Sequence, residues 1–227
     1  MSKGATLRQV LMLAKKDITV ELRRAHEFMS ILAFAVTSIL VSSFAWQGAF
    51  SLSPVVISAT LWIVVYFSSI LALTTSFARE VDRGTIDGLR SLPCPAYSIL
   101  LGKVLYGGAI LLMVLISTVL TSVVFLNIDA SVLPALLIVF AVGVVDLAMI
   151  GSVVSALVMY SEGKTLLLSF LFFPVSVPIL IPGTQAAGKV LSGVGLIGVV
   201  PELRLLLAFL LAIVAVSILL FRHVFLE

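Results

Sequence analysis

The chain has 227 residues, of which 61% are hydrophobic and only 11% are charged, whereas a soluble domain carries about 25% charged residues. This deficit predicts an integral membrane protein and excludes a large soluble core. The net charge of +3 does not indicate a nucleic-acid partner, because the basic residues stand at the edges of apolar runs and not in one stripe with aromatics. A single cysteine excludes a disulfide framework and a cysteine metal cluster.

The N-terminal segment, 1–27, mixes charged residues with apolar residues at helical spacing. The apolar positions are Leu7, Val10, Leu11, Ala14, Ile18 and Leu22. We expect an amphipathic, interfacial helix on the surface of the lipid bilayer, with its cations towards the headgroups. The alternative is a cap packed on the protein itself. We expect no cleavable signal peptide, because no short apolar core with a small-residue cleavage site follows the first charges.

Six apolar stretches reach or approach the roughly 20 residues that a membrane-spanning helix needs. They are 28–46, 54–78, 104–126, 132–158, 165–181 and 203–221. We therefore predict an all-α integral membrane protein, with six transmembrane helices and the N-terminal amphipathic helix in one domain, 1–227. The fifth stretch contains Pro174 and Pro178, which predict a kinked or broken helix. Residues 183–200 are expected to form a re-entrant or interfacial element, because their apolar run is too short to span.

Lysine and arginine are unequally distributed between the two sides of this predicted bundle. The N-terminal segment holds six and the connection 79–103 holds four, whereas the connections on the other side hold only Lys189. Positive charge favours the cytoplasmic side of a membrane. We therefore predict a multi-pass protein of the inner (cytoplasmic) membrane with both termini in the cytoplasm.

The connection 79–103 carries seven charged residues and several residues that interrupt helices. Gly84 is suited to the left-handed conformation that ends a helix, and Thr85 can cap a new short helix. Pro93 stops that helix, because the residue before a proline avoids the helical region. Pro95 can occupy the first turn of the next helix. We predict a helix end, a short helix of about two turns, and a new helix start.

Two apolar residues of this short helix, Ile86 and Leu89, lie three positions apart and therefore share one face. We expect a groove on a partner protein to receive them, because their apolar surface would otherwise be exposed to water. Charged residues that would orient the docking surround them, namely Glu80, Asp82, Arg83, Asp87 and Arg90. The alternative is an ordinary solvated connector.

The pattern Glu80-x-x-x-Gly84-Thr85-Ile86-Asp87-x-Leu89-x-x-x-Pro93 resembles the coupling-helix signature of ABC-2-type permeases. Two further patterns are Leu92-Pro93-x-Pro95-x-x-x-x-Leu100-x-Gly102-Lys103 and the fifth span Phe173-Pro174-Val175-Ser176-Val177-Pro178-Ile179-Leu180-Ile181. Together they resemble the haem exporter protein B family, the membrane permeases of cytochrome c maturation ABC systems. The resemblance covers essentially the whole chain. It implies that ATPase coupling involves Glu80, Arg83, Gly84, Thr85, Ile86, Asp87, Leu89, Arg90 and Pro93.

The resemblance also implies what this chain works with. It implies a non-catalytic subunit, with ATP hydrolysed by a separate ABC ATPase subunit whose cleft receives the coupling helix. A haem-handling membrane protein, a haem chaperone and a second copy of the chain are the other implied partners. The complex would handle haem, and we expect no cofactor bound directly to this chain. The alternatives are an ABC-2 exporter of another small molecule or lipid, and a membrane scaffold without an ATPase.

Three residues of the predicted spans are candidates for a transport pathway or an interface: Asp146, Pro174 and Pro178. Asp146 lies within an apolar stretch, where a charge costs about 2.5–3.5 kcal/mol on insertion scales. It is either a polar contact of a pathway or interface, or a protonated acid with a packing role. The two prolines form either a moving gate or a fixed kink.

Cys94, His26 and His223 are weak candidates for haem ligands. Each has a simpler interpretation, since Cys94 is a small residue in a turn and the histidines stand at membrane edges. No spacing of His, Cys and carboxylates predicts a metal site. The sequence Gly163-Lys164-Thr165 resembles the end of a Walker A motif, but Val158 stands where that motif needs its first glycine. We therefore predict a short turn there.

Overall fold

The computed structural model describes residues 3–23, 25–46, 53–73 and 76–226. Within this part the helices are α1 (Lys3–Arg23), α2 (Ala25–Trp46), α3 (Pro54–Leu73), α4 (Ala78–Asp82), α5 (Ile86–Arg90), α6 (Ala96–Phe125), the 3-10 helix η1 (Ala130–Val132), α7 (Leu133–Val158), α8 (Lys164–Leu191), the 3-10 helix η2 (Leu196–Val199) and α9 (Val200–Leu226). Six of these described segments are long and apolar enough to cross a membrane. The prediction of an all-α, six-span architecture is confirmed.

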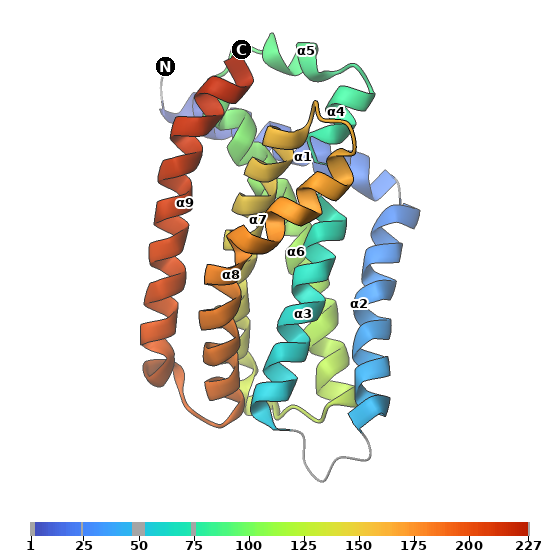
Figure 1. Ribbon diagram of the computed structural model, residues 1–227, viewed down its shortest axis with the longest axis vertical. Coiled ribbons are helices and arrows are strands. Elements are labelled where there is room, and N and C mark those ends of the chain that lie inside the picture. The colour runs from blue at the N-terminus through green and yellow to red at the C-terminus, as the bar shows by residue number, and fades with distance from the viewer. Residues whose placement is uncertain (1–2, 24, 47–52, 74–75, 227) are drawn as a thin grey trace.

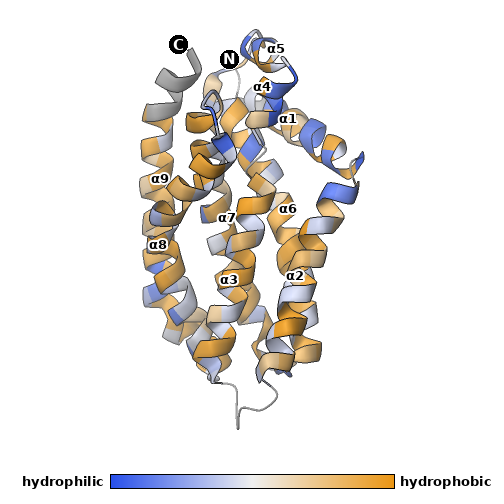
Figure 2. Ribbon diagram, turned by 45° about the vertical axis from the view of Figure 1, so that its right-hand side comes forward, coloured by the Kyte–Doolittle hydropathy of each residue, from blue (hydrophilic) through white to orange (hydrophobic). Residues whose placement is uncertain are grey.

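The six long helices run side by side, with both chain ends near α4 and α5 (Figure 1). The connections between α6 and α7 and between α8 and α9 lie at the opposite end. Hydrophobic residues cover the long helices, whereas hydrophilic residues gather at α1, α4 and α5 (Figure 2). We call the end that carries α1, α4 and α5 the charged end.

Helix α7 lies in the centre of the bundle and packs against α3, α6, α8 and α9. Its contact with α3 is built around Trp62, whose ring stacks on Phe140 with the ring centroids 4.6 Å apart. Gly143 of α7 and Gly183 of α8 leave room for this indole, because a Cβ there would lie 2.2 Å and 2.4 Å from its ring atoms. These two glycines therefore allow three helices to approach one large side chain.

The fifth span is longer than the sequence predicts. Helix α8 continues to Leu191 and contains Pro174, Pro178 and Pro182. It changes direction midway along its length (Figure 1), as expected where prolines remove backbone donors, so the helix is kinked and not broken. The expectation of a separate re-entrant element at 183–200 is wrong, because packing of Gly183 and its neighbours against the bundle extends the helix beyond the prolines.

Helix α1 lies across the charged end and packs on α6. Val10, Ala14 and Glu21 are buried on its inner side, whereas Leu7 and Leu11 are exposed on its outer side. The inner side thus forms a cap on the protein. The exposed apolar side is compatible with a membrane surface, and that placement stays a prediction.

Candidate functional site at the charged end

The loop from Phe77 to Pro95, which we call the charged loop, contains α4 and α5. Gly84 has φ +65°, and the backbone N–H of Thr85 donates to Glu80 O at 2.9 Å, which closes the end of α4. The prediction for Gly84 is therefore confirmed. Thr85 is the N-cap residue of α5, as predicted, but its hydroxyl makes no capping hydrogen bond and donates instead to the Glu80 carboxylate and backbone carbonyl. Helix α5 ends at Arg90 after five residues, and Pro95 precedes α6.

The two apolar residues of α5 point into this protein. Ile86 is 6% exposed and Leu89 is 5% exposed. They belong to a buried apolar cluster with Phe77, Ile99, Leu100, Met149, Val153, Ala156 and Met159. The expectation that these side chains await a partner's groove is wrong, because α6 and α7 of the same chain form the groove. Burial of this apolar surface fixes α5 on the end of the bundle.

The outward side of the charged loop is polar, with one apolar residue at its edge. The exposed residues are Asp82, Arg83, Gly84, Thr85, Asp87, Gly88, Ser91, Leu92 and Pro93. We call them the loop surface. Leu92 is 40% exposed. This surface, and not the pair Ile86 and Leu89, is available to another protein.

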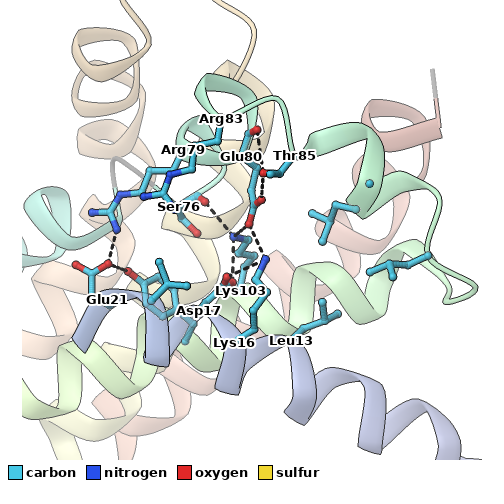
Figure 3. Close-up of a pocket in the computed structure, with 15 residues that line it drawn as sticks. Leu13, Lys16, Asp17, Glu21, Ser76, Arg79, Glu80, Arg83, Thr85 and Lys103 are labelled. Atoms are coloured by element: carbon cyan, nitrogen blue, oxygen red, sulfur yellow. Dashed lines mark hydrogen bonds and ion pairs between the residues drawn. The ribbon is translucent and has the colours of Figure 1, made fainter. Parts of the chain in front are cut away.

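A network of charged side chains ties the charged loop to α1 and α6 (Figure 3). The Glu80 carboxylate accepts hydrogen bonds from Lys103 Nζ at 3.0 Å and from Lys16 Nζ at 2.9 Å. Lys103, which is 4% exposed, also lies 3.0 Å from Asp17 and donates to Ser76 O at 3.1 Å. Each of these buried charges has an opposite charge, as burial requires.

A second ion-pair group lies beside the first. The Arg79 guanidinium donates to the carboxylates of Glu21 and Glu27, and the Tyr106 hydroxyl donates to Glu21 at 2.9 Å. The two groups line a pocket of about 440 Å³ between α1, α6 and the charged loop (Figure 3). Because its charges pair with one another, we interpret the network as a brace that orients the loop.

Sequence reasoning missed the α1 half of this brace. The available signal was the spacing of Val10, Ala14, Asp17 and Glu21, which places two carboxylates on the same face as two small apolar residues. Acidic residues on the packed face of a helix predict buried cations opposite them.

The charged loop is also fastened to the end of α7 and the start of α8. The backbone N–H of Phe77 donates to Ser155 Oγ at 3.1 Å. The guanidinium of Arg90 lies over the ring of Tyr160, 5.7 Å from its centroid, and Lys164 pairs with Asp82. The turn expected at Gly163-Lys164-Thr165 ends at Gly163, which is the left-handed N-cap of α8, and Lys164 and Thr165 are the first residues of that helix.

The other candidate residues lie apart from the charged loop. Asp146 is 0% exposed in the middle of α7, and neither carboxylate oxygen has a hydrogen-bond partner among the described residues. It precedes Val158, the last residue of α7, by 12 positions, or about 18 Å along the helix. Pro174 and Pro178 lie within α8.

The weak haem-ligand candidates lie on different elements, with His26 on α2, Cys94 in the charged loop and His223 on α9. His26 is exposed, with Nε2 3.8 Å from a Glu27 carboxylate oxygen. Burial raises the pKa of the Cys94 thiol, which disfavours the thiolate that binds iron. His223 belongs to α9, but its side chain lies outside the described part of the chain. Haem ligation by these residues stays an untested prediction.

Six apolar helices that pack into one bundle define a multi-pass helical membrane protein. A model of the CcmB protein family matches residues 8–224, and the chain therefore belongs to that family. One relative, the protein named "Heme exporter protein B" of Pseudomonas aeruginosa, is 26% identical over 186 residues, which cover 80% of this chain and 82% of the relative. The resemblance found in the motifs is thus confirmed.

Proposed function

We propose that this chain is the membrane (permease) subunit of an ABC complex that serves cytochrome c biogenesis, and that the complex handles haem. Family membership and the name of the relative support this assignment. The chain would not be catalytic, because ATP would be hydrolysed by a separate ATPase subunit. The energy would drive haem export or the release of a haem-loaded chaperone, with a haem-handling membrane protein as a further partner.

The observation that carries the proposal is the loop surface together with its braces. The loop surface includes Arg83, Asp87 and Leu92, and it stands on a loop fixed from one side by Glu80 and its partners. A solvated connector needs no such fastening, whereas a loop that receives force from a partner must be rigid to pass it on. We infer that the loop surface docks on the ATPase subunit.

The distribution of positive charge supports a direction for the complex. Lysine and arginine concentrate at the charged end, which would place this end and both termini in the cytoplasm of the cell. The ATPase subunit would then lie where ATP is available. Helix α1 would lie at the inner surface of the membrane, because only residue 24 separates it from the first span.

The docking proposal is tested by affinity purification of the complex from its native membrane, with identification of the subunits. The variant is Asp87→Lys with Leu92→Asp, which reverses a charge and adds one on the loop surface without touching a buried side chain. The matched control is Arg204→Glu with Ile197→Asp, two exposed residues at the opposite end. We expect the first variant to lose the ATPase subunit and the control to retain it, at equal amounts in the membrane.

Equal recovery of the ATPase with both variants would reject the loop surface as the docking site. Recovery of no ATPase with the unaltered chain would instead support a membrane scaffold. Recovery of an ATPase without any haem-binding protein would favour an exporter of another small molecule or lipid. A second copy of the chain in the complex is expected, and the ratio of subunits measures it.

A further inference from the structure

We propose that α7 is the element that carries movement of the charged loop into the membrane, and that Asp146 is the first ionisable side chain of α7 that this movement reaches. This inference rests on the proposed function, since the movement comes from the ATPase subunit. The sequence alone favours the helices joined by the charged loop, α3 and α6, as the path. The contacts of the charged loop favour its packing partner α7.

The apolar side of α5 shares one buried cluster with a stripe of side chains on α7. Met149, Val153, Ala156 and Met159 are all buried in the cluster that contains Ile86 and Leu89. Their spacing of three and four residues places them on one face of the helix. Closely packed side chains cannot be compressed, so a displacement of α5 towards the bundle must displace this face of α7.

Polar contacts add a fixed attachment to this packing. The hydrogen bond from the Phe77 N–H to Ser155 Oγ is buried within the same stretch of α7. The contact of Arg90 with Tyr160 holds the end of the helix. The charged loop can therefore pull on α7 as well as push it, which a purely apolar contact does not allow.

The charged loop and its apolar cluster contact a longer stretch of α7 than of α6. The contacts of α6 come from Ala96, Ile99, Leu100, Lys103 and Val104, which span about 12 Å along the helix. The stripe of α7 from Met149 to Met159 spans about 15 Å along that helix. In addition, Lys103 is tied to Asp17 of α1, so α6 is held at the charged end while α7 extends the contact inward.

Asp146 lies one turn of α7 beyond the end of this stripe, since it precedes Met149 by three residues. Its carboxyl group is fully buried and has no hydrogen-bond partner among the described residues. An isolated charge in such a place is costly, so the carboxyl group is neutral in this arrangement of the helices. Movement of α7 against α9, which also packs on the cluster through Leu210 and Ile213, changes its surroundings.

The inference is tested by infrared difference spectroscopy on the complete complex, comparing the nucleotide-free state with a state trapped by a non-hydrolysable ATP analogue. The carbonyl stretch of a neutral carboxyl group reports its hydrogen bonding. The signal of Asp146 is the part of the difference spectrum that disappears in Asp146→Asn. We expect this signal to be present in the unaltered complex and to follow nucleotide binding.

Two variants in the same cluster then distinguish transmission through α7 from transmission through α6. Met149→Ala with Val153→Ala shortens the stripe of α7, whereas Ile99→Ala with Leu100→Ala removes the contacts of α6. We expect the α7 variant to lose most of the Asp146 signal while the ATPase subunit stays bound, and the α6 variant to keep it. Thermal unfolding of each purified variant verifies that both fold.

The proposal is overturned if the Asp146 signal does not respond to nucleotide, or if the α6 variant loses it as fully as the α7 variant. Failure of the proposed function gives a different result, because no ATPase subunit is then recovered with the unaltered chain. Asp146 is a positioning or sensing residue in this inference, and its test needs no measurement of transport.

Discussion

Different kinds of contact stabilise the two ends of the bundle. At the charged end, Arg79, Glu80 and Lys103 fasten a folded loop to neighbouring helices, and α5 is packed over a buried cluster. At the opposite end, the described residues include one ion pair, Lys189 with Glu202 at 2.6 Å. The other links between helices there are single hydrogen bonds, such as that from Ser43 Oγ to Phe125 O at 2.8 Å.

This difference supports the proposal that the charged end is the one that binds another protein. Replacing a buried ion pair with apolar side chains is often neutral or stabilising, so such pairs are weak evidence for stability alone. Their use at the charged end is better explained by orientation, because the pairs of Arg79 and Glu80 fix the loop relative to α1, α2 and α6. The opposite end needs only to join helices, and short connections are sufficient for that.

The largest expected effect is that of a charge placed under the charged loop. Ile86→Asp puts a carboxylate into the buried apolar cluster and should cost more than about 4 kcal/mol of unfolding free energy. The comparison is Ile197→Asp at the opposite end, where the isoleucine is 90% exposed. We expect a large loss of thermal stability in detergent for the first variant and little change for the second. Similar losses for both would remove the distinction between the ends.

The next effect concerns the ion pairs themselves. Lys103→Met leaves Asp17 and part of Glu80 without their buried cation, and losing one partner of a buried pair costs about 3–5 kcal/mol. Lys189→Met is the matched change at the opposite end, where the lysine side chain is 46% exposed, and it should cost about 1 kcal/mol or less. Chemical denaturation of both variants measures the difference. A larger cost for the second variant would show that the bracing of the charged end is not special.

The sequence predicts the six spans and the helix breaks of the charged loop, because hydropathy and the backbone preferences of glycine and proline act locally. Gly84 is an example: its position after a charged turn is enough to predict the left-handed conformation. The direction in which Ile86 and Leu89 point is not local. It depends on α7, which begins 43 residues after α5 ends, so an apolar face alone cannot distinguish a partner's groove from the protein's own.

The same limit applies to α8 and to the brace. Proline lowers the expected length of a helix, but the packing of Gly183 against Trp62 extends α8 to Leu191. The pairing of Glu21 with Arg79 joins residues 58 positions apart. Both features arise from tertiary contacts, which outweigh local preference.

A smaller effect on stability is expected at a feature that both ends share, a glycine with a positive φ angle. Gly84 and Gly193 have φ angles of +65° and +84°, and alanine in this conformation costs about 1–2 kcal/mol. Gly84→Ala and Gly193→Ala should therefore lower stability by similar amounts. Gly88→Ala is the control, because Gly88 is helical with open space around it, and alanine favours a helix over glycine by about 1 kcal/mol. Unequal losses of stability would mean that one end carries backbone strain beyond that of its turn.

The smallest expected effect is on the reactivity of the Cys94 thiol at the charged end. Burial raises the pKa of the Cys94 thiol, and the thiolate is the form that reacts with an alkylating reagent. At neutral pH Cys94 should therefore react more slowly than the exposed thiol of a Cys94→Ser, Val194→Cys variant at the opposite end. Its rate should continue to rise at a pH where the introduced thiol has reached its maximum.

Alkylation also compares the two ends in the complex. Cys94 lies between the loop surface and α6, so a docked ATPase subunit should slow its reaction further and leave the introduced thiol unaffected. Mass spectrometry of the alkylated chain, with and without the ATPase subunit, measures both rates. Equal protection of both thiols would mean that the partner covers more than the charged end, and protection of neither would argue against docking beside α5.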